Sequence, residues 1–134
     1  MTDVLIACEA SWIIEDLKAS LVAPGTTIRV VNTGAAVRDE VDAETPDLVI
    51  LDLQIGNMGG MATCLDLRLE AGAGRLPHVP VLMLLDRAAD VFLANSSDAD
   101  GWIIKPLDAI RLRKAINALL TGGTYHESQT AAVS

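Results

Sequence analysis

The stretch from Pro46 to Gly60 constrains the fold of this chain more than any other part of the sequence. Its first half, Leu48 to Leu51, is a continuous apolar run without helical spacing, bounded by a proline and a glycine-rich turn. Such a run predicts a strand that is buried on both faces, as at the centre of a parallel sheet. The strand ends in Asp52, at the edge where open α/β sheets place their chemistry. The alternative is that Asp52 only caps the next turn.

Length and composition indicate one globular domain. The chain has 134 residues, of which 51% are hydrophobic and 21% charged, enough to bury a core. It has no apolar run of membrane-spanning length and no basic segment at its start, so we expect neither membrane insertion nor a signal peptide. Two cysteines without metal-ligand spacing favour a reducing cytoplasm. A net charge of −8 disfavours direct binding of nucleic acids, because phosphate contacts need a basic face.

Apolar runs and segments with helical spacing alternate along the chain. Strands are predicted at 4–7, 27–31, 48–52, 81–85 and 102–104, and helices at 11–22, 35–43, 61–70, 88–94 and 108–120. The inner faces of three helices are predicted to be Ile13, Ile14, Leu17 and Leu21, then Met61, Leu65 and Leu69, then Ile110, Ile116, Leu119 and Leu120. This alternation predicts a five-stranded parallel sheet with helices on both faces, and right-handed crossovers favour the order 2-1-3-4-5. Two glycines end the last helix, so we expect one domain over residues 1–121 and a flexible tail over 122–134.

In this order, the carboxyl ends of the first, third and fifth strands meet at one edge of the sheet. They bring together Glu9, Asp52 and Lys105. Two carboxylates suit Mg²⁺, and the lysine supplies a positive charge for a phosphate oxygen. A carboxylate can also be the nucleophile that forms an aspartyl phosphate. The sequence therefore indicates a site for a divalent cation and a phosphoryl group.

The residues that follow the third and fifth predicted strands form a motif that is similar to one in a known protein family. The spacing of Asp52, Met58 and Gly60 and the Lys105-Pro106 pair after an aromatic-led strand resemble the receiver domain of two-component response regulators over positions 4–120. The resemblance implies a flavodoxin-like fold and a signalling module, not an enzyme. It also implies that Asp52 is the phosphoacceptor and that Lys105 contacts the phosphoryl group.

The same resemblance implies a metal site and a switch. Glu9, Asp52 and the backbone carbonyl of Gln54 would hold Mg²⁺, and the peptide bond before Pro106 would be cis. Trp102, at the start of the predicted fifth strand, takes the aromatic switch position. The interaction surface is expected on the fourth helix, fifth strand and fifth helix, with Trp102, Arg111 and Lys114.

Three positions depart from the family pattern. Cys8 stands where the family has the first of two metal-binding acids, and a thiol is a poor ligand for Mg²⁺. Leu85 stands where a Ser or Thr hydroxyl bonds the phosphoryl group. Gly56 replaces a proline and loosens its loop. We therefore expect weak Mg²⁺ binding at most, and we assign no role to His78 or His126.

Two functions from different classes fit this sequence. The first is an atypical receiver that acts through protein–protein interaction, with phosphorylation switching weakened or absent. The alternative is a receiver that signals by accepting a phosphoryl group on Asp52. The partner is then a histidine kinase or a constitutive protein of a larger complex, and a homodimer through the interaction surface is a further alternative. A nucleotide or flavin binder is disfavoured, because no glycine-rich loop follows the first strand, where Cys8 to Trp12 stand instead.

Overall fold

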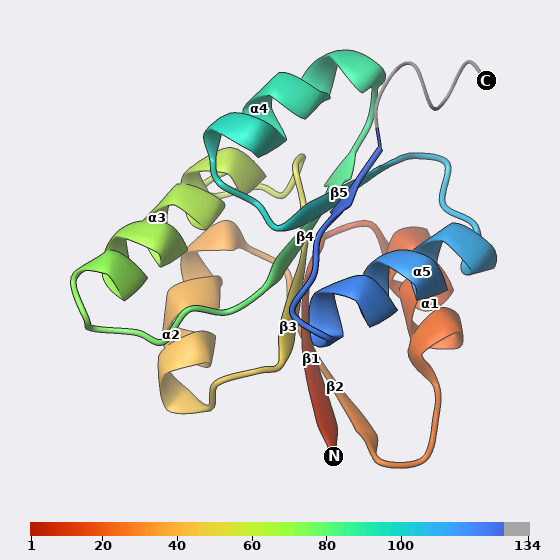
Figure 1. Ribbon diagram of the computed structural model, residues 1–134, viewed down its shortest axis with the longest axis horizontal. Helices are drawn as coiled ribbons and strands as arrows, with labels where there is room; N and C mark the ends of the chain where they lie inside the picture. Colours follow the sequence, from red (N-terminus) through yellow and green to blue (C-terminus); the bar gives the residue numbers. More distant parts are fainter. Residues whose placement is uncertain (128–134) are drawn as a thin grey trace.

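The computed structural model describes residues 1–127 and shows a parallel sheet with helices on both faces (Figure 1). The strands are β1 (Thr2–Ala7), β2 (Thr26–Val31), β3 (Leu48–Asp52), β4 (Val81–Leu85), β5 (Gly101–Ile104) and β6 (Tyr125–His126). The helices are α1 (Ser11–Leu21), α2 (Val37–Ala43), α3 (Gly60–Gly72), α4 (Val91–Ser96) and α5 (Ala109–Leu120), with 3-10 turns η1 (Gly34–Ala36) and η2 (Ala88–Asp90). The sheet order is β2-β1-β3-β4-β5-β6, which confirms the predicted α/β class and the predicted order of the first five strands.

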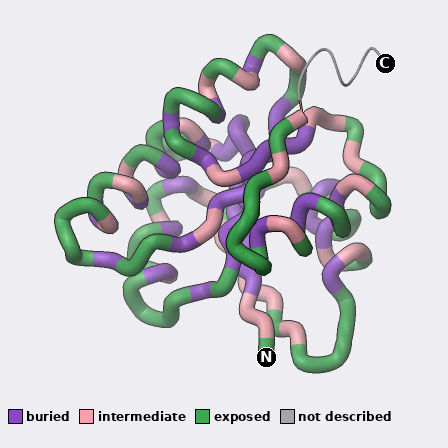
Figure 2. Tube along the Cα trace, viewed as in Figure 1, coloured by how far each residue is buried: buried purple, intermediate pink, exposed green. Residues whose placement is uncertain are grey.

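The sheet separates two apolar cores. Helices α1 and α5 cover one face, and α2, α3 and α4 cover the other (Figure 1). Side chains alternate between the two cores along β1, where Val4 and Ile6 face α1 while Leu5 and Ala7 face α2. Every residue of β3 and β4 is buried, and Figure 2 shows this burial concentrated along the middle of the molecule. The central strands therefore hold their carboxyl ends in fixed positions.

The sheet has a sixth strand that the five-stranded prediction lacks. Tyr125 and His126 pair in parallel with Gly101 and Trp102 of β5, so part of the segment predicted as a tail from residue 122 lies against the sheet. Two residues are too short to show an alternating pattern, and the ring stacking of His126 on Trp102 is not visible in a linear sequence. The remainder of the predicted tail, 128–134, lies outside the described residues.

The predicted inner faces were right for α1 and partly wrong for α3 and α5. Ile13, Ile14, Leu17 and Leu21 are all buried. On α3, Leu65 and Leu69 are 37% and 70% exposed, and the helix instead buries Cys64 and Leu67. Leucines at every second position of 65–69 point to both sides of a helix, so spacing alone does not choose between them.

On α5, Ile110 and Leu120 are exposed, at 69% and 37%. The buried face of α5 consists of Leu112, Ala115, Ile116 and Leu119. Ile110 is two residues before Leu112 and therefore lies on the opposite side of the helix from this face. Among the helices that the structure describes, none is long and apolar enough to cross a membrane.

Candidate functional site

Asp52 lies at the carboxyl edge of the sheet, as the last residue of β3. Its side chain is only 6% exposed. The oxygen Oδ1 accepts hydrogen bonds from Lys105 Nζ at 3.0 Å and from the backbone N–H of Gln54 at 3.1 Å. The other oxygen, Oδ2, accepts from the thiol of Cys8 at 3.3 Å. Because a buried carboxylate needs such donors, these contacts hold Asp52 in place with both oxygens engaged.

Lys105 joins two carboxylates at this edge. It follows β5 and precedes Pro106 in a cis peptide bond. Its Nζ donates to Asp52 Oδ1 at 3.0 Å and to Asp86 Oδ1 at 2.8 Å. Burial alone would lower the pKa of Lys105, but the hydrogen bonds and charges of Asp86 and Asp52 outweigh it and raise this pKa. The ammonium group therefore stays charged between its two partners.

Asp86 is the residue of this site that the sequence reading missed. It comes directly after β4, whereas the predicted site was built only from residues at the ends of the first, third and fifth strands. The signal was present, because the carboxyl end of β4 meets the same edge of the sheet.

Cys8 faces Asp52 as a neutral thiol. The residue is fully buried, and burial, with the nearby Asp52 charge, raises the pKa of its thiol to about 11. At neutral pH the sulfur keeps its proton and acts as a hydrogen-bond donor. Where the family pattern has an acid, this chain therefore supplies a donor that meets the oxygen Oδ2 directly.

Glu9 turns toward the loop after β3. Its Oε1 accepts a hydrogen bond from the backbone N–H of Gly56 at 2.5 Å. A proline at position 56 has no N–H to donate, and a Cβ there would lie 2.3 Å from Oε1 of Glu9. Gly56 therefore leaves room for the Glu9 carboxylate and also donates the hydrogen bond to it. This contact links Glu9 and Gly56, two positions that the sequence alone does not connect.

The donor set does not fit a preformed magnesium site. Mg²⁺ requires hard oxygen ligands in near-octahedral geometry, but Glu9 is held by Gly56 and Cys8 presents a protonated sulfur. Within residues 1–127, no group of three or more His, Cys, Asp or Glu side chains is placed to hold a metal ion. Glu9, Asp52 and Gln54, which the resemblance assigns to the metal, line one hollow at this edge of the sheet.

The side chain of Leu85, at the end of β4, contributes only packing. Leu85 is fully buried and belongs to the core beneath α2, α3 and α4, together with Trp102. Its backbone carbonyl accepts a hydrogen bond from the N–H of Lys105 at 2.7 Å. A leucine side chain offers no hydrogen bond to a group on Asp52.

The C-terminal segment, Tyr125 to Glu127, contacts two residues of the predicted interaction surface, Trp102 and Arg111. Trp102 is 4% exposed, its ring stacks on that of His126 with centroids 4.0 Å apart, and its Nε1 donates to the backbone carbonyl of Glu127 at 2.7 Å. The carboxylate of Glu127 pairs with Arg111 at 2.7 Å. Lys114 is exposed on α5. His126, which received no role from the sequence, is therefore a packing partner of Trp102.

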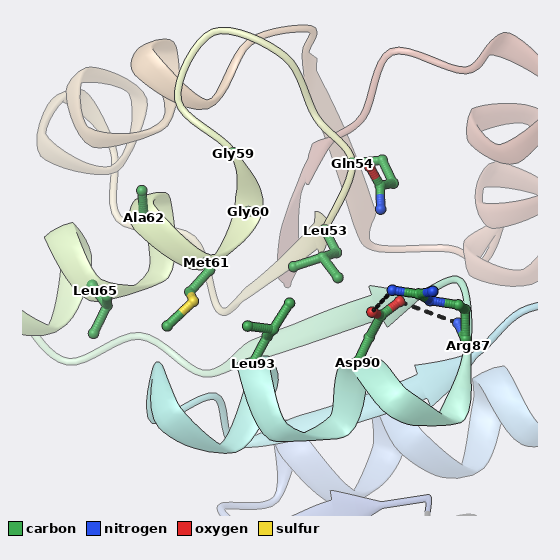
Figure 3. A pocket seen from close by; sticks show the side chains of 10 residues that line it. All are labelled: Leu53, Gln54, Gly59, Gly60, Met61, Ala62, Leu65, Arg87, Asp90 and Leu93. Atoms are coloured by element: carbon green, nitrogen blue, oxygen red, sulfur yellow. Dashed lines mark hydrogen bonds and ion pairs between the residues drawn. The ribbon is translucent and has the colours of Figure 1, made fainter.

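Two hollows lie beside these groups. One, of about 480 Å³, is lined by Asp52, Asp86, Lys105 and the exposed ring of Trp12 among others. The second, of about 490 Å³, lies between the start of α3 and the η2–α4 segment. In Figure 3 the side chains of Met61 and Leu93 face each other across it, and the Arg87–Asp90 ion pair lies at one end. The first hollow reaches the carboxylate of Asp52.

Comparison with known proteins identifies the fold and the family together. The chain matches the model of the response regulator receiver domain over residues 4–117. It belongs to this family. Members of the family are phospho-accepting signalling modules of two-component systems.

The relatives of this receiver domain are longer proteins. It is 30% identical over 131 residues to the sensory transduction protein RegX3 of Mycobacterium tuberculosis, covering 96% of this chain and 55% of RegX3. It is 31% identical over 119 residues to the DNA-binding response regulator MtrA of Mycobacterium leprae, covering 87% of this chain and 50% of MtrA. The chain thus spans about half the length of the curated relatives it matches.

Solved receiver domains have the same fold. A signal receiver domain of a histidine kinase from Syntrophus aciditrophicus superposes with a TM-score of 0.78 at 28% identity, covering 91% of this chain and 92% of that one. A LuxR-family response regulator from Aurantimonas superposes with a TM-score of 0.81 at 22% identity, covering 99% and 94%.

Proposed function

We propose that this receiver domain acts through protein–protein contacts and that phosphorylation of Asp52 switches it weakly or not at all. The observation that carries the proposal is Leu85, an apolar and fully buried residue at the end of β4. A phosphoryl group shifts a conformational equilibrium only if it contacts the two states differently. Leu85 offers it no hydrogen bond in either state.

The site supports slow phosphoryl transfer better than it supports switching. In that reaction, an oxygen of Asp52 attacks phosphorus and forms an O–P bond, while the bond from phosphorus to the donor's histidine nitrogen or acetate oxygen breaks. The leaving group keeps the electron pair of the broken bond. The ammonium of Lys105, 3.0 Å from Oδ1 of Asp52, offsets the negative charge that develops on the phosphoryl oxygens.

The metal contribution to that reaction is proposed to be weak. Asp52, Glu9 and the carbonyl of Gln54 would hold Mg²⁺, which neutralises charge on a transferring phosphoryl group when bound. Glu9 must first leave the N–H of Gly56, and the thiol of Cys8 must give up its contact with Oδ2. Both requirements lower the affinity of the site for Mg²⁺.

The partner is proposed to be a protein, either a histidine kinase or a constitutive component of a larger complex in the cytoplasm. An acidic chain of net charge −8 has little attraction for nucleic acid. The surface of α4, β5 and α5 is proposed for contact with this partner or with a second copy. Lys114 and Ile110 are exposed there, whereas Trp102 and Arg111 are engaged by the C-terminal segment.

The alternative is a receiver that signals by phosphorylation. The observation that favours it is the direct contact of Lys105 with Asp52, since this pair positions an acceptor beside a positive charge. The alternative requires that a phosphoryl group on Asp52 change the surface of α4, β5 and α5.

Intact-protein mass spectrometry after incubation with acetyl phosphate and Mg²⁺ tests the acceptor, with Asp52→Asn as the control. Backbone amide NMR shifts of the same samples test the switch. We expect a slow, partial gain of one phosphoryl group, absent in the control, with small shifts in α4, β5 and α5. Leu85→Thr should enlarge those shifts. Rapid, complete modification with large shifts in the unmodified sequence would establish the alternative instead.

A further inference from the structure

Asp86 and Asp52 share one ammonium group. Lys105 Nζ lies 2.8 Å from Asp86 Oδ1 and 3.0 Å from Asp52 Oδ1. The side chains of Lys105 and Asp86 are 18% and 36% exposed, and all three residues line the same hollow. An anion that reaches Asp52 through this hollow therefore meets a lysine already paired with a second carboxylate.

The pairing has a direct electrostatic consequence. A phosphoryl group on Asp52 replaces one negative charge with up to two, next to the carboxylate of Asp86. The incoming oxygens also need the donors of Lys105, one of which is given to Asp86. The group at Asp52 must therefore displace Asp86 or share the lysine with it, and like charges held this close repel each other.

The backbone around Asp86 favours the paired arrangement. Leu85, before it, is fixed in β4, and its carbonyl accepts from the N–H of Lys105 at 2.7 Å. Arg87, after it, is tied to Asp90 by the backbone N–H at 3.2 Å and the side chain at 3.4 Å, as Figure 3 shows. Asp86 thus lies between two anchored neighbours, and its side chain is presented to Lys105 from a restrained backbone.

We propose that Asp86 is a positioning residue that holds Lys105 in the unmodified protein and competes with the phosphoryl group for it. This inference rests on the proposed role of Asp52 as acceptor. It adds a cause of weak phosphorylation that is independent of Leu85 and Cys8, because it acts through the lysine alone. Replacing the carboxylate of Asp86 with a neutral amide leaves Lys105 with a weaker acceptor and removes the repulsion.

The test compares the rate of phosphorylation of Asp52 by acetyl phosphate in the full chain, by intact mass, for the unmodified sequence and for Asp86→Asn and Asp86→Glu. A partly exposed ion pair predicts a rate about two- to five-fold higher for Asp86→Asn, and a return toward the original rate for Asp86→Glu. Because the effect is one of charge, the ratio should shrink as ionic strength rises. Asp108→Asn, an acid at the start of α5 that pairs with Arg111, is the matched control and should leave the rate unchanged.

The possible results separate the two ideas. If the unmodified chain is phosphorylated and Asp86→Asn is no faster, or is faster by a salt-independent factor, the competition is refuted while the acceptor role of Asp52 stands. If neither chain gains a phosphoryl group and both match Asp52→Asn, the acceptor role fails and the competition falls with it. A faster, salt-sensitive Asp86→Asn that Asp86→Glu reverses supports the inference.

Discussion

Replacement of Glu127 by alanine tests whether the C-terminal segment is part of the folded domain. The carboxylate of Glu127 accepts hydrogen bonds from Arg111 Nη1 at 2.7 and 2.8 Å and from the backbone N–H of Ile104 at 2.9 Å. The variant removes these contacts but leaves the backbone carbonyl that accepts from Trp102. If the segment is bound as described, Glu127→Ala destabilises the whole domain, because α5 and β5 lose a common partner.

The magnitude follows from the two kinds of contact. The ion pair has side chains that are 31% and 13% exposed, so it contributes up to about 1 kcal/mol. The N–H of Ile104 loses its acceptor, at a cost of about 1 kcal/mol where water can reach the edge of the sheet. The free energy of unfolding should therefore fall by about 2 kcal/mol. For a chain of this length that corresponds to a decrease in Tm of roughly 6–10 °C.

Thermal and urea unfolding followed by circular dichroism measure this change. Glu127→Gln keeps an acceptor oxygen for Ile104 and should lose about half as much. Glu15→Ala, an exposed acid on α1, removes the same charge elsewhere and should have little effect. Truncation after Thr121, the end of the predicted domain, should destabilise at least as much as Glu127→Ala. The reasoning is refuted if Glu127→Ala and Glu15→Ala unfold alike.

Two further predictions concern the packing of one turn and the pH dependence of α5. A Cβ on Gly34 would lie 1.8 Å from the carbonyl oxygen of Met58, so Gly34→Ala should lower the free energy of unfolding by about 1–3 kcal/mol. Gly72 in α3 has open space around it, so Gly72→Ala should raise the free energy of unfolding by about 0.5–1 kcal/mol. Urea unfolding of the two variants measures both changes. The backbone N–H and guanidinium of Arg111 hold the pKa of Asp108 below its usual 3.8, so its contribution to stability is present above pH 3.8 and is lost as pH falls below it. Asp108→Asn retains the cap and should make stability less sensitive to pH below about 4, as acid titrations of the unfolding midpoint would show.

Burial on both faces made the central strands predictable. The bounds of β3 and β4 agree with the predicted 48–52 and 81–85, because a strand covered on both faces is apolar at every position. The buried face of helix α1 was equally predictable, since its aliphatic residues Ile13, Ile14, Leu17 and Leu21 all lie on it. The buried face of helix α3 could not be predicted, because apolar residues occur on its exposed side as well. Strand β6 could not be predicted either, because its stability comes from partners far away in the sequence.

The site likewise has a part that the sequence predicts and a part that it does not. Topology alone brings Asp52 and Lys105 to one edge, and the structure places them 3.0 Å apart. The direction of Glu9 depends on a single N–H in a loop, that of Gly56, and the pairing of Asp86 depends on a side-chain torsion. Sequence patterns carry residue types and spacing, whereas these contacts depend on local geometry that follows only once the fold is known.

The substitution at Cys8 and the pairing at Lys105 form one electrostatic arrangement. With an acid at position 8, the edge would hold Asp52, Asp86, Glu9 and a fourth carboxylate against one ammonium, and a divalent cation would be needed to balance them. The neutral thiol removes one of those charges and donates to Oδ2 of Asp52, while Glu9 is turned to Gly56. What remains is two carboxylates on one lysine, an arrangement that is satisfied by the protein's own donors. A site satisfied in this way has less to gain from either a metal ion or a phosphoryl group, and this favours a receiver that works through a stable surface.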